Sequence, residues 1–353
     1  MPITTNYCPI IFDKRAELHA LASLSQESRK NMAPLIQIRH PEPRESSPSH
    51  WNPLSALMDR ILDPSDGLVG CWGSATQIRI DLRDIRIQEF DRTPLNDFYE
   101  QCRDVGIRAV PVTGRDQPQE LRDAVARAAR RLGHGACVRV VSEDLGIGTG
   151  GLRLVLNELD LPRNAVDLVL DLGNLPADNS YLLSRIVGED LATFRPLRDW
   201  RSVTVVGSSF PPNLSSVVEH NSFNLLPRIE MGIWRKLLVA ADLGTPPAFG
   251  DYGIVSADSP PGHRGAANIR YTVGDQWYVE RGHPVDKADS DDYLRLAKNL
   301  RESDVWRTAK HCSGCAFIEG QINSGRPGNA TQWRKAGFDH HFEVVRETLD
   351  LAA

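Results

Sequence analysis

The feature that most constrains the fold is a repeated alternation of short apolar runs with amphipathic stretches. The runs are rich in β-branched residues and often apolar throughout, which is typical of parallel strands that are covered on both faces. Most of them are separated by stretches with helical periodicity. The eight runs cover residues 7–12, 33–38, 77–83, 107–113, 136–142, 166–172, 202–209 and 252–258. Eight such units predict an α/β fold in which residues 1–258 form a (β/α)8 TIM-like barrel, with a doubly wound open sheet as the alternative.

One of the predicted helices has recognisable ends. Asp116 is followed three positions later by Gln119, in the manner of a capping box, and Gly133 stands where the helix would stop. We therefore expect a helix that begins after Asp116 and ends at Gly133.

The pattern changes after residue 258, which predicts an irregular α+β extension over residues 259–353. Residues 269–282 read as a hairpin with Gly274 and Asp275 at its turn, and residues 289–303 as a short amphipathic helix. The apolar stretch around the adjacent His340 and His341 reads as a terminal strand, so alternation would direct the two histidines to opposite faces. We expect this extension to pack on the barrel.

Composition indicates a cytoplasmic protein. The formal net charge is −5, so bulk electrostatics do not favour nucleic acid or an anionic membrane. The first residues lack the charged and apolar regions of a signal peptide, and no stretch approaches the ~20 apolar residues of a membrane span. Four of the six cysteines are scattered, which fits reduced thiols.

Candidate functional residues stand at the C-terminal ends of the predicted strands, where barrels place their reacting groups. Carboxylates there could hold Mg²⁺ or Mn²⁺ or transfer protons, while arginines clamp an anion. The alternative is that these side chains are simply polar strand ends that pair with one another. The candidates are Arg39, His40, Asp81, Arg83, Thr113, Arg139, Ser142, Glu143, Asp144, Asp171, Ser208, Ser209 and Asp258.

A glycine-rich loop follows the fifth run. Gly146, Gly148 and Gly151 match G-x-G-x-x-G between a predicted strand and helix, and Asp171 ends the next run. This outline is typical of dinucleotide binding. Ser142 to Leu145 precede the first glycine, however, where the motif would turn at once, and the unit lies mid-chain among similar βα units. A bound phosphate-sized anion or a plain flexible loop are the other interpretations.

A second motif, HCSGC at residues 311–315, places Cys312 and Cys315 at the spacing of a zinc knuckle beside His311. His340 or His341 could supply a fourth ligand. Alternatively, the cysteines are a reduced pair in a packed loop, and one of the two histidines faces the barrel mouth, where its proton affinity suits acid–base work. A redox role lacks the thioredoxin-like context.

Three segments resemble the bacteriophage "beta protein" family, and the resemblance spans most of the chain. They are YCPIIFDKRAELHALASL followed by APLIQI, then IRYTVGDQWYVERG, and finally GNATQWRKAGFDHHFEVV. The resemblance implies a phage–host or defence context and a barrel-like fold. It supplies no reaction and no catalytic residues. The HCSGC pair is not a feature of the resemblance, which weighs against zinc.

Two functions are expected. In the first, the barrel hydrolyses a phosphate-bearing substrate such as a nucleotide or a nucleic acid. Asp81 and Asp171 would then bind a metal or act as acid and base, Arg83 and Arg139 would clamp phosphate, and His40 with His340 or His341 would transfer protons. In the second, a non-catalytic barrel recognises a phage ligand or a protein partner encoded nearby. A nicotinamide-linked oxidoreductase is a distant third.

Overall fold

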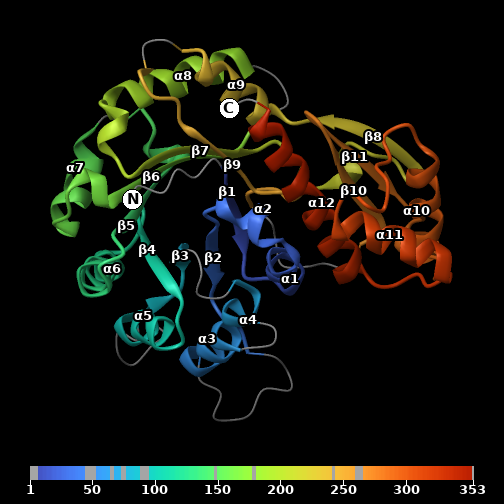
Figure 1. Ribbon diagram of the computed structural model, residues 1–353, viewed down its shortest axis with the longest axis horizontal. Helices are drawn as coiled ribbons and strands as arrows, with labels where there is room; N and C mark the ends of the chain where they lie inside the picture. The colour runs from blue at the N-terminus through green and yellow to red at the C-terminus, as the bar shows by residue number, and fades with distance from the viewer. Residues whose placement is uncertain are drawn as a thin grey trace.

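Eight parallel strands form a closed barrel in the computed structural model, which describes residues 7–43, 53–63, 67–72, 77–87, 95–146, 149–176, 180–240, 243–258 and 265–351 (Figure 1). Each barrel strand pairs in parallel with both of its neighbours, and β1 closes the ring against β9. The barrel strands are β1 (Tyr7–Phe12), β2 (Leu35–Arg39), β3 (Gln77–Asp84), β4 (Arg108–Thr113), β5 (Ala136–Val141), β6 (Val166–Asn174), β7 (Ser202–Ser208) and β9 (Ala248–Asp251). The predicted TIM-like barrel is confirmed, and the open sheet is excluded.

Helices alternate with the strands and cover the outside of the barrel (Figure 1). The predicted stop at Gly133 is confirmed, because this residue adopts φ 68° and ends α6. The predicted cap is wrong: Pro118 occupies the N-cap position, and the Asp116 carboxylate instead accepts a hydrogen bond from Arg83. The helices are α1 (Arg15–Ser23), α2 (Gln26–Lys30), α3 (Pro53–Leu62), α4 (Leu68–Trp72), α5 (Leu95–Asp104), α6 (Gln119–Leu132), α7 (Thr149–Leu159), α8 (Ser180–Thr193) and α9 (Ile229–Leu238).

The eighth barrel strand lies earlier in the chain than predicted. Residues 252–258 form turns, and the strand is the four-residue Ala248–Asp251 that precedes them. A further strand, β8 (Ser222–Pro227), was not predicted. It leaves the barrel and pairs antiparallel with β11 (Gln276–Arg281), which in turn pairs with β10 (Asn268–Val273). The polypeptide between β7 and α9 therefore contributes to the sheet of the extension.

The extension combines this three-stranded sheet with three helices, α10 (Asp292–Glu302), α11 (Ser313–Ser324) and α12 (Ala330–Asp350). The predicted hairpin is confirmed, with Gly274 at φ 55° in its turn, and the amphipathic helix is α10. The predicted terminal strand is wrong. His340 and His341 lie in the 21-residue helix α12, which begins with a capping box between Asn329 and Gln332.

Helix α12 packs between the barrel and the extension (Figure 1). It contacts α1 and β1 on one side and α11 and β10 on the other. Phe338 and Phe342 belong to the barrel core, whereas Trp333 and Ala336 belong to the smaller core of the extension. No helix in the described ranges is long and apolar enough to cross a membrane.

Candidate functional site

Three charged side chains meet inside the barrel toward the C-terminal ends of its strands. The Arg139 guanidinium on β5 lies between Asp81 on β3 and Asp171 on β6. Its Nη1 donates to Asp81 Oδ2 at 2.8 Å, and its Nε and Nη2 donate to Asp171 Oδ2 at 2.9 and 2.6 Å. Arg139 is 4% exposed, Asp81 is 0% and Asp171 is 3%. The structure thus brings together three of the side chains placed at the mouth from sequence.

Further donors complete this buried network. Tyr252 Oη donates to Asp171 Oδ2 at 2.7 Å, and Arg83 Nε donates to Asp81 Oδ2 at 2.7 Å. Burial opposes ionisation of Asp81, but the Arg83 and Arg139 cations and their hydrogen bonds outweigh it and lower the pKa of this carboxyl. Arg139 occupies the place between the two carboxylates that a metal ion would need. The roles assigned to Asp81, Arg83, Arg139 and Asp171 stay predictions.

Some polar atoms beside this network lack a partner in the described part of the chain. They are Arg83 Nη2, Thr113 Oγ1 and Gln117 Oε1, all of them buried. Gln117 Nε2 donates to Asp81 Oδ1 at 3.2 Å, so its amide oxygen faces away from that carboxylate. Polar groups of this kind are usually satisfied by water or by a ligand.

Two other predicted residues of the mouth lie outside the network. His40 follows β2, and its Nδ1 accepts a hydrogen bond from the Arg86 amide at 3.3 Å. Glu143 is exposed in a short 3₁₀ turn after β5, where it accepts from Ser142 Oγ at 3.0 Å. Neither of them contacts the carboxylates in the described interactions.

The glycine loop after β5 is partly described. Gly146 has φ 75°, and its amide donates to Asp190 Oδ1 at 2.9 Å, so a carboxylate already occupies that donor. Gly151 lies in the first turn of α7, where a Cβ would come 2.5 Å from Arg115 Cδ. Gly148 lies outside the described residues. Dinucleotide or anion binding by this loop stays a prediction.

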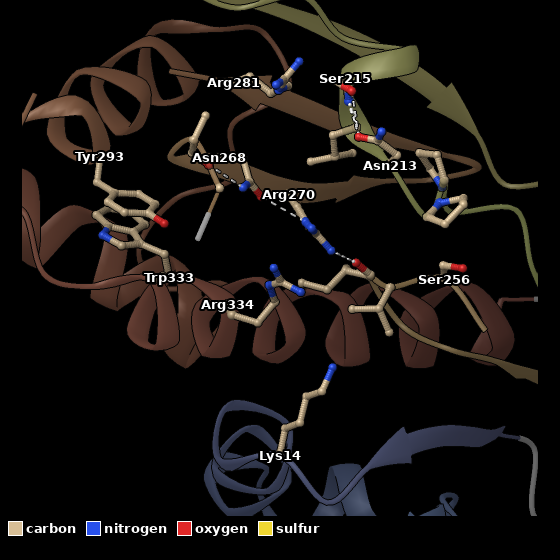
Figure 2. A pocket seen from close by; sticks show the side chains of 18 residues that line it. Lys14, Asn213, Ser215, Ser256, Asn268, Arg270, Arg281, Tyr293, Trp333 and Arg334 are labelled. Atoms are coloured by element: carbon tan, nitrogen blue, oxygen red, sulfur yellow. Dashed lines mark hydrogen bonds between the residues drawn. The ribbon is translucent and has the colours of Figure 1, made fainter. Parts of the chain in front are cut away.

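A cavity of about 560 Å³ lies between the barrel and the extension (Figure 2). Lys14 comes from the segment after β1, and residues 211–215 and 254–256 come from the segments after β7 and β9, the seventh and eighth barrel strands. The extension supplies the opposite wall from β10, α10 and the start of α12. We call this cavity the anion pocket. Its polar lining consists of Lys14, Asn213, Ser215, Ser256, Asn268, Arg270, Arg281, Tyr293 and Arg334.

The anion pocket is strongly cationic. Among the described residues that line it are one lysine and three arginines, and there is no aspartate, glutamate or histidine. Figure 2 shows Arg270 and Arg334 directed toward one another across the pocket, with Lys14 approaching from the barrel side. Burial and then the nearby Arg334 cation lower the pKa of Arg270 well below its ordinary value. An anion between the two guanidinium groups would relieve this repulsion.

Arg270 and Arg334 differ in their existing contacts. Arg270 Nη1 donates to the Ile254 carbonyl at 2.6 Å, and its Nε donates to Asn268 Oδ1 at 3.0 Å, so its orientation is fixed. Arg334 makes no hydrogen bond or ion pair with any described residue. Burial lowers the pKa of Arg334, and the Glu17 carboxyl and Tyr293 oppose this shift. The anion pocket could not be predicted from the residues at the strand ends, because its walls meet only when the extension packs on the barrel.

His341 is buried against Asp251, the last residue of barrel strand β9. Its Nε2 lies 2.9 Å from Asp251 Oδ2 on β9, and its Nδ1 lies 2.8 Å from Thr272 Oγ1 on β10. Asp251, Thr272 and His341 are each at most 1% exposed. Burial lowers the pKa of His341 despite the nearby Asp251 carboxylate. This triad therefore ties α12 to both the barrel and the extension.

His340 faces a different set of side chains from those of His341. Its Nδ1 lies 3.4 Å from Cys315 Sγ and 3.7 Å from Cys312 Sγ. His311, Cys312 and His340 are the one group of three or more potential metal ligands among the described residues. The motif and the histidine that were paired from sequence thus meet in space.

Comparison with known proteins identifies a family over almost the whole length of the chain. The model of the Beta protein family matches residues 7–346. The search of curated proteins finds no match. The chain is similar to the crystal structure of the N-terminal domain of a candidate aldolase from Bacteroides vulgatus, with 11% identity and a TM-score of 0.33, covering 98% of this chain and 96% of that one. At this score the likeness carries no argument about function.

Proposed function

The chain belongs to the Beta protein family, and we propose that it is a binding barrel that recognises a phosphate-bearing ligand in the anion pocket. The observation that carries the proposal is Arg334, a partly buried cation that makes no hydrogen bond or ion pair with any described residue. Arg334 lies opposite the oriented guanidinium of Arg270. Arginine binds phosphate through paired, charge-assisted hydrogen bonds.

The position of the pocket supports the same ligand class. In TIM barrels, phosphate groups frequently bind at the loops after the seventh and eighth strands. Here those loops are residues 211–215 after β7 and 254–256 after β9. The side-chain amide of Asn213 lies beside the cations as a neutral donor, whereas the Ser215 and Ser256 hydroxyls already donate to Asn213 Oδ1 and Asn174 Oδ1.

Recognition without turnover fits this lining better than hydrolysis at the same place. The described lining offers no carboxylate or imidazole that could act as a general base. In the phage–host context that the family implies, the bound molecule would be a phage-derived or phage-induced nucleotide or nucleic-acid end. A protein encoded nearby would then receive the signal.

Hydrolysis of a phosphate-bearing substrate is the second candidate. It is favoured by the convergence of Asp81, Arg139 and Asp171 and by the unpartnered polar atoms of Arg83 and Gln117 beside them. For this chemistry the Arg139 guanidinium would have to release one carboxylate when substrate or Mg²⁺ arrives.

Binding is tested by calorimetry with inorganic phosphate, pyrophosphate, nucleoside mono-, di- and triphosphates, and short RNA and DNA. We expect at least one of them to bind, and Arg334→Gln to weaken binding by about 10- to 100-fold, because a hydrogen bond to a charged group contributes about 1.5–3 kcal/mol. Arg326→Gln is the matched control, since Arg326 is exposed and lies outside the pocket. Binding that is insensitive to Arg334→Gln, or absent for the whole panel, refutes the proposal.

Hydrolysis is measured on the same panel with Mg²⁺, Mn²⁺ or EDTA. Metal-dependent turnover that disappears in Asp171→Asn would establish the second candidate, and turnover that persists in this variant would exclude its assignment. Circular dichroism of the variant establishes that it is folded.

A further inference from the structure

Two cysteines and a histidine approach one another in the extension at the separations of a metal site. Cys312 is the N-cap residue of α11, and Cys315 lies one turn into that helix. His340 Nδ1 lies 3.7 Å from Cys312 Sγ and 3.4 Å from Cys315 Sγ. Tetrahedral zinc with Zn–S and Zn–N bonds of about 2.3 and 2.05 Å separates its sulfur and nitrogen ligands by roughly 3.6 Å. The observed distances lie on both sides of this value.

His311 provides a fourth ligand. The ligand atoms of His311, Cys312 and His340 all lie within 4.8 Å of one another, and the His311 side chain is only 10% exposed. Cys315 Sγ lies 3.4 Å from His340 Nδ1 but outside this mutual 4.8 Å group, so it would have to approach the other ligands to complete a set of four. We call these four residues the Cys–His cluster. Two thiolates and two imidazoles are a common ligand set for structural zinc.

The surroundings orient the ligands as metal-bound residues are usually oriented. His340 Nε2 lies 2.9 Å from the Thr272 carbonyl oxygen, so this nitrogen carries the proton and Nδ1 presents its lone pair to the two sulfur atoms. The ring is stacked on Tyr271 at 3.6 Å, which fixes its plane. The Cys315 amide donates to Cys312 Sγ at 3.3 Å.

His311 has a comparable outer partner. Its Nδ1 lies 3.5 Å from Glu347 Oε1 on α12, and a carboxylate in this place raises the basicity of a metal-bound imidazole. Its Nε2 lies 3.4 Å from Arg307 Nη1. The partly exposed Arg307 also forms an ion pair with Glu347. Arg307 would therefore keep a partner if His311 Nε2 bound a metal instead of Arg307.

We propose that the Cys–His cluster binds one zinc ion as a closed structural site. Four protein ligands leave no open position, so the ion would hold the start of α11 against α12 and, through the Thr272 carbonyl, against β10. A packed pair of reduced thiols explains the burial of Cys315. It accounts for one S–H donor on His340 Nδ1, but not for a second sulfur atom at 3.7 Å and a second histidine beside the same ring. The proposal is independent of the ligand in the anion pocket.

The first experiment uses the full chain, purified and stripped of metal under reducing conditions. We expect it to bind one zinc per chain by mass spectrometry of the metal, with a higher Tm in the zinc-loaded form. Cobalt should give the intense visible bands of tetrahedral Co²⁺ together with a thiolate-to-cobalt charge-transfer band. A folded chain that binds neither ion, or an octahedral cobalt spectrum, overturns the proposal without any variant.

Variants identify the ligands. Cys312→Ser and His340→Gln should abolish the tetrahedral cobalt spectrum, whereas Cys102→Ala, which removes a buried thiol from α5 in the barrel, should leave it unchanged. Glu347→Gln should weaken zinc binding by about 10- to 100-fold, as loss of an outer partner does. Cobalt bands that survive in both Cys312→Ser and His340→Gln would place the ion elsewhere and overturn the assignment.

Discussion

Arg139 offers the sharpest test of how the barrel interior is held together. Replacing Arg139 with methionine keeps most of the volume but removes the cation from between Asp81 and Asp171. Both carboxylates are at most 3% exposed, so they would be left buried without their shared counter-charge. Breaking a buried ion pair in this way costs about 3–5 kcal/mol, out of a total stability of about 5–15 kcal/mol.

The expected loss can be measured by calorimetry and by urea unfolding. At about 2.1 cal/mol/K per residue, a chain of 353 residues has an unfolding entropy of roughly 0.7 kcal/mol/K, so Tm should fall by about 4–7 °C. The variant should remain folded at 25 °C.

The pH dependence gives the sign of the effect. In the native protein the pKa of Asp81 lies below its ordinary value, so the stability contributed by this carboxylate is present above that value and is lost as pH falls through the folded pKa. In Arg139→Met the pKa of Asp81 should instead rise, because burial is no longer offset by this cation. The loss in the free energy of unfolding caused by Arg139→Met should therefore be larger at pH 7 than at pH 4.

A triple variant separates charge from packing. Asp81→Asn and Asp171→Asn, added to Arg139→Met, remove all three charges, and we expect a substantial part of the lost stability to return. A cost below about 1 kcal/mol for Arg139→Met, or a deficit that does not change with pH, would refute the reasoning that these carboxylates depend on Arg139.

Two further predictions concern the contacts of α1 and α11. Burial raises the pKa of Glu17 to about 8, so its stabilising contribution is complete below the unfolded value near 4.5 and is lost as pH rises toward 8. Glu17→Gln should match the wild type at pH 4 and exceed it by a few kcal/mol at pH 8 in urea unfolding. Gly314→Ala should destabilise the chain by about 1–3 kcal/mol, because its Cβ would lie 2.2 Å from the Ala336 carbonyl oxygen. Gly320→Ala, in the same helix with nothing within 4 Å, should stabilise it by up to about 1 kcal/mol, and equal effects of the two substitutions would contradict this packing.

The barrel could be predicted because each βα unit carries its own periodic signal. Runs such as residues 166–172 are buried on both faces and read as strands without any knowledge of their neighbours. The eighth strand was placed wrongly from sequence because Ala248–Asp251 is only four residues long and contains a glycine. Strand β8 was not predicted because most of its residues are not buried, so it lacks the apolar pattern of the barrel strands.

The candidate sites also differ in how much of each could be predicted from the sequence. Asp81, Arg139 and Asp171 could be placed together from sequence because the topology of a parallel barrel gathers its strand ends. That the arginine would neutralise the two carboxylates depends on side-chain geometry that the pattern does not contain. The anion pocket depends on still more distant contacts, since Lys14, Arg270 and Arg334 come from three segments that meet only in the folded chain.

Helix α12 explains both the wrong prediction of a strand around His340 and His341 and the organisation of the extension. A helix that packs on one core shows one apolar stripe, but α12 is buried on more than one face, and its apolar residues therefore also satisfy the alternation of a strand. Arg334 and His341 are seven residues apart, two turns of helix, and so share the face toward the barrel and the anion pocket. His340 is rotated by about 100° and faces α11 and the Cys–His cluster. The adjacent histidines thus lie at the boundary between the two cores, with His341 against the barrel and His340 against the Cys–His cluster.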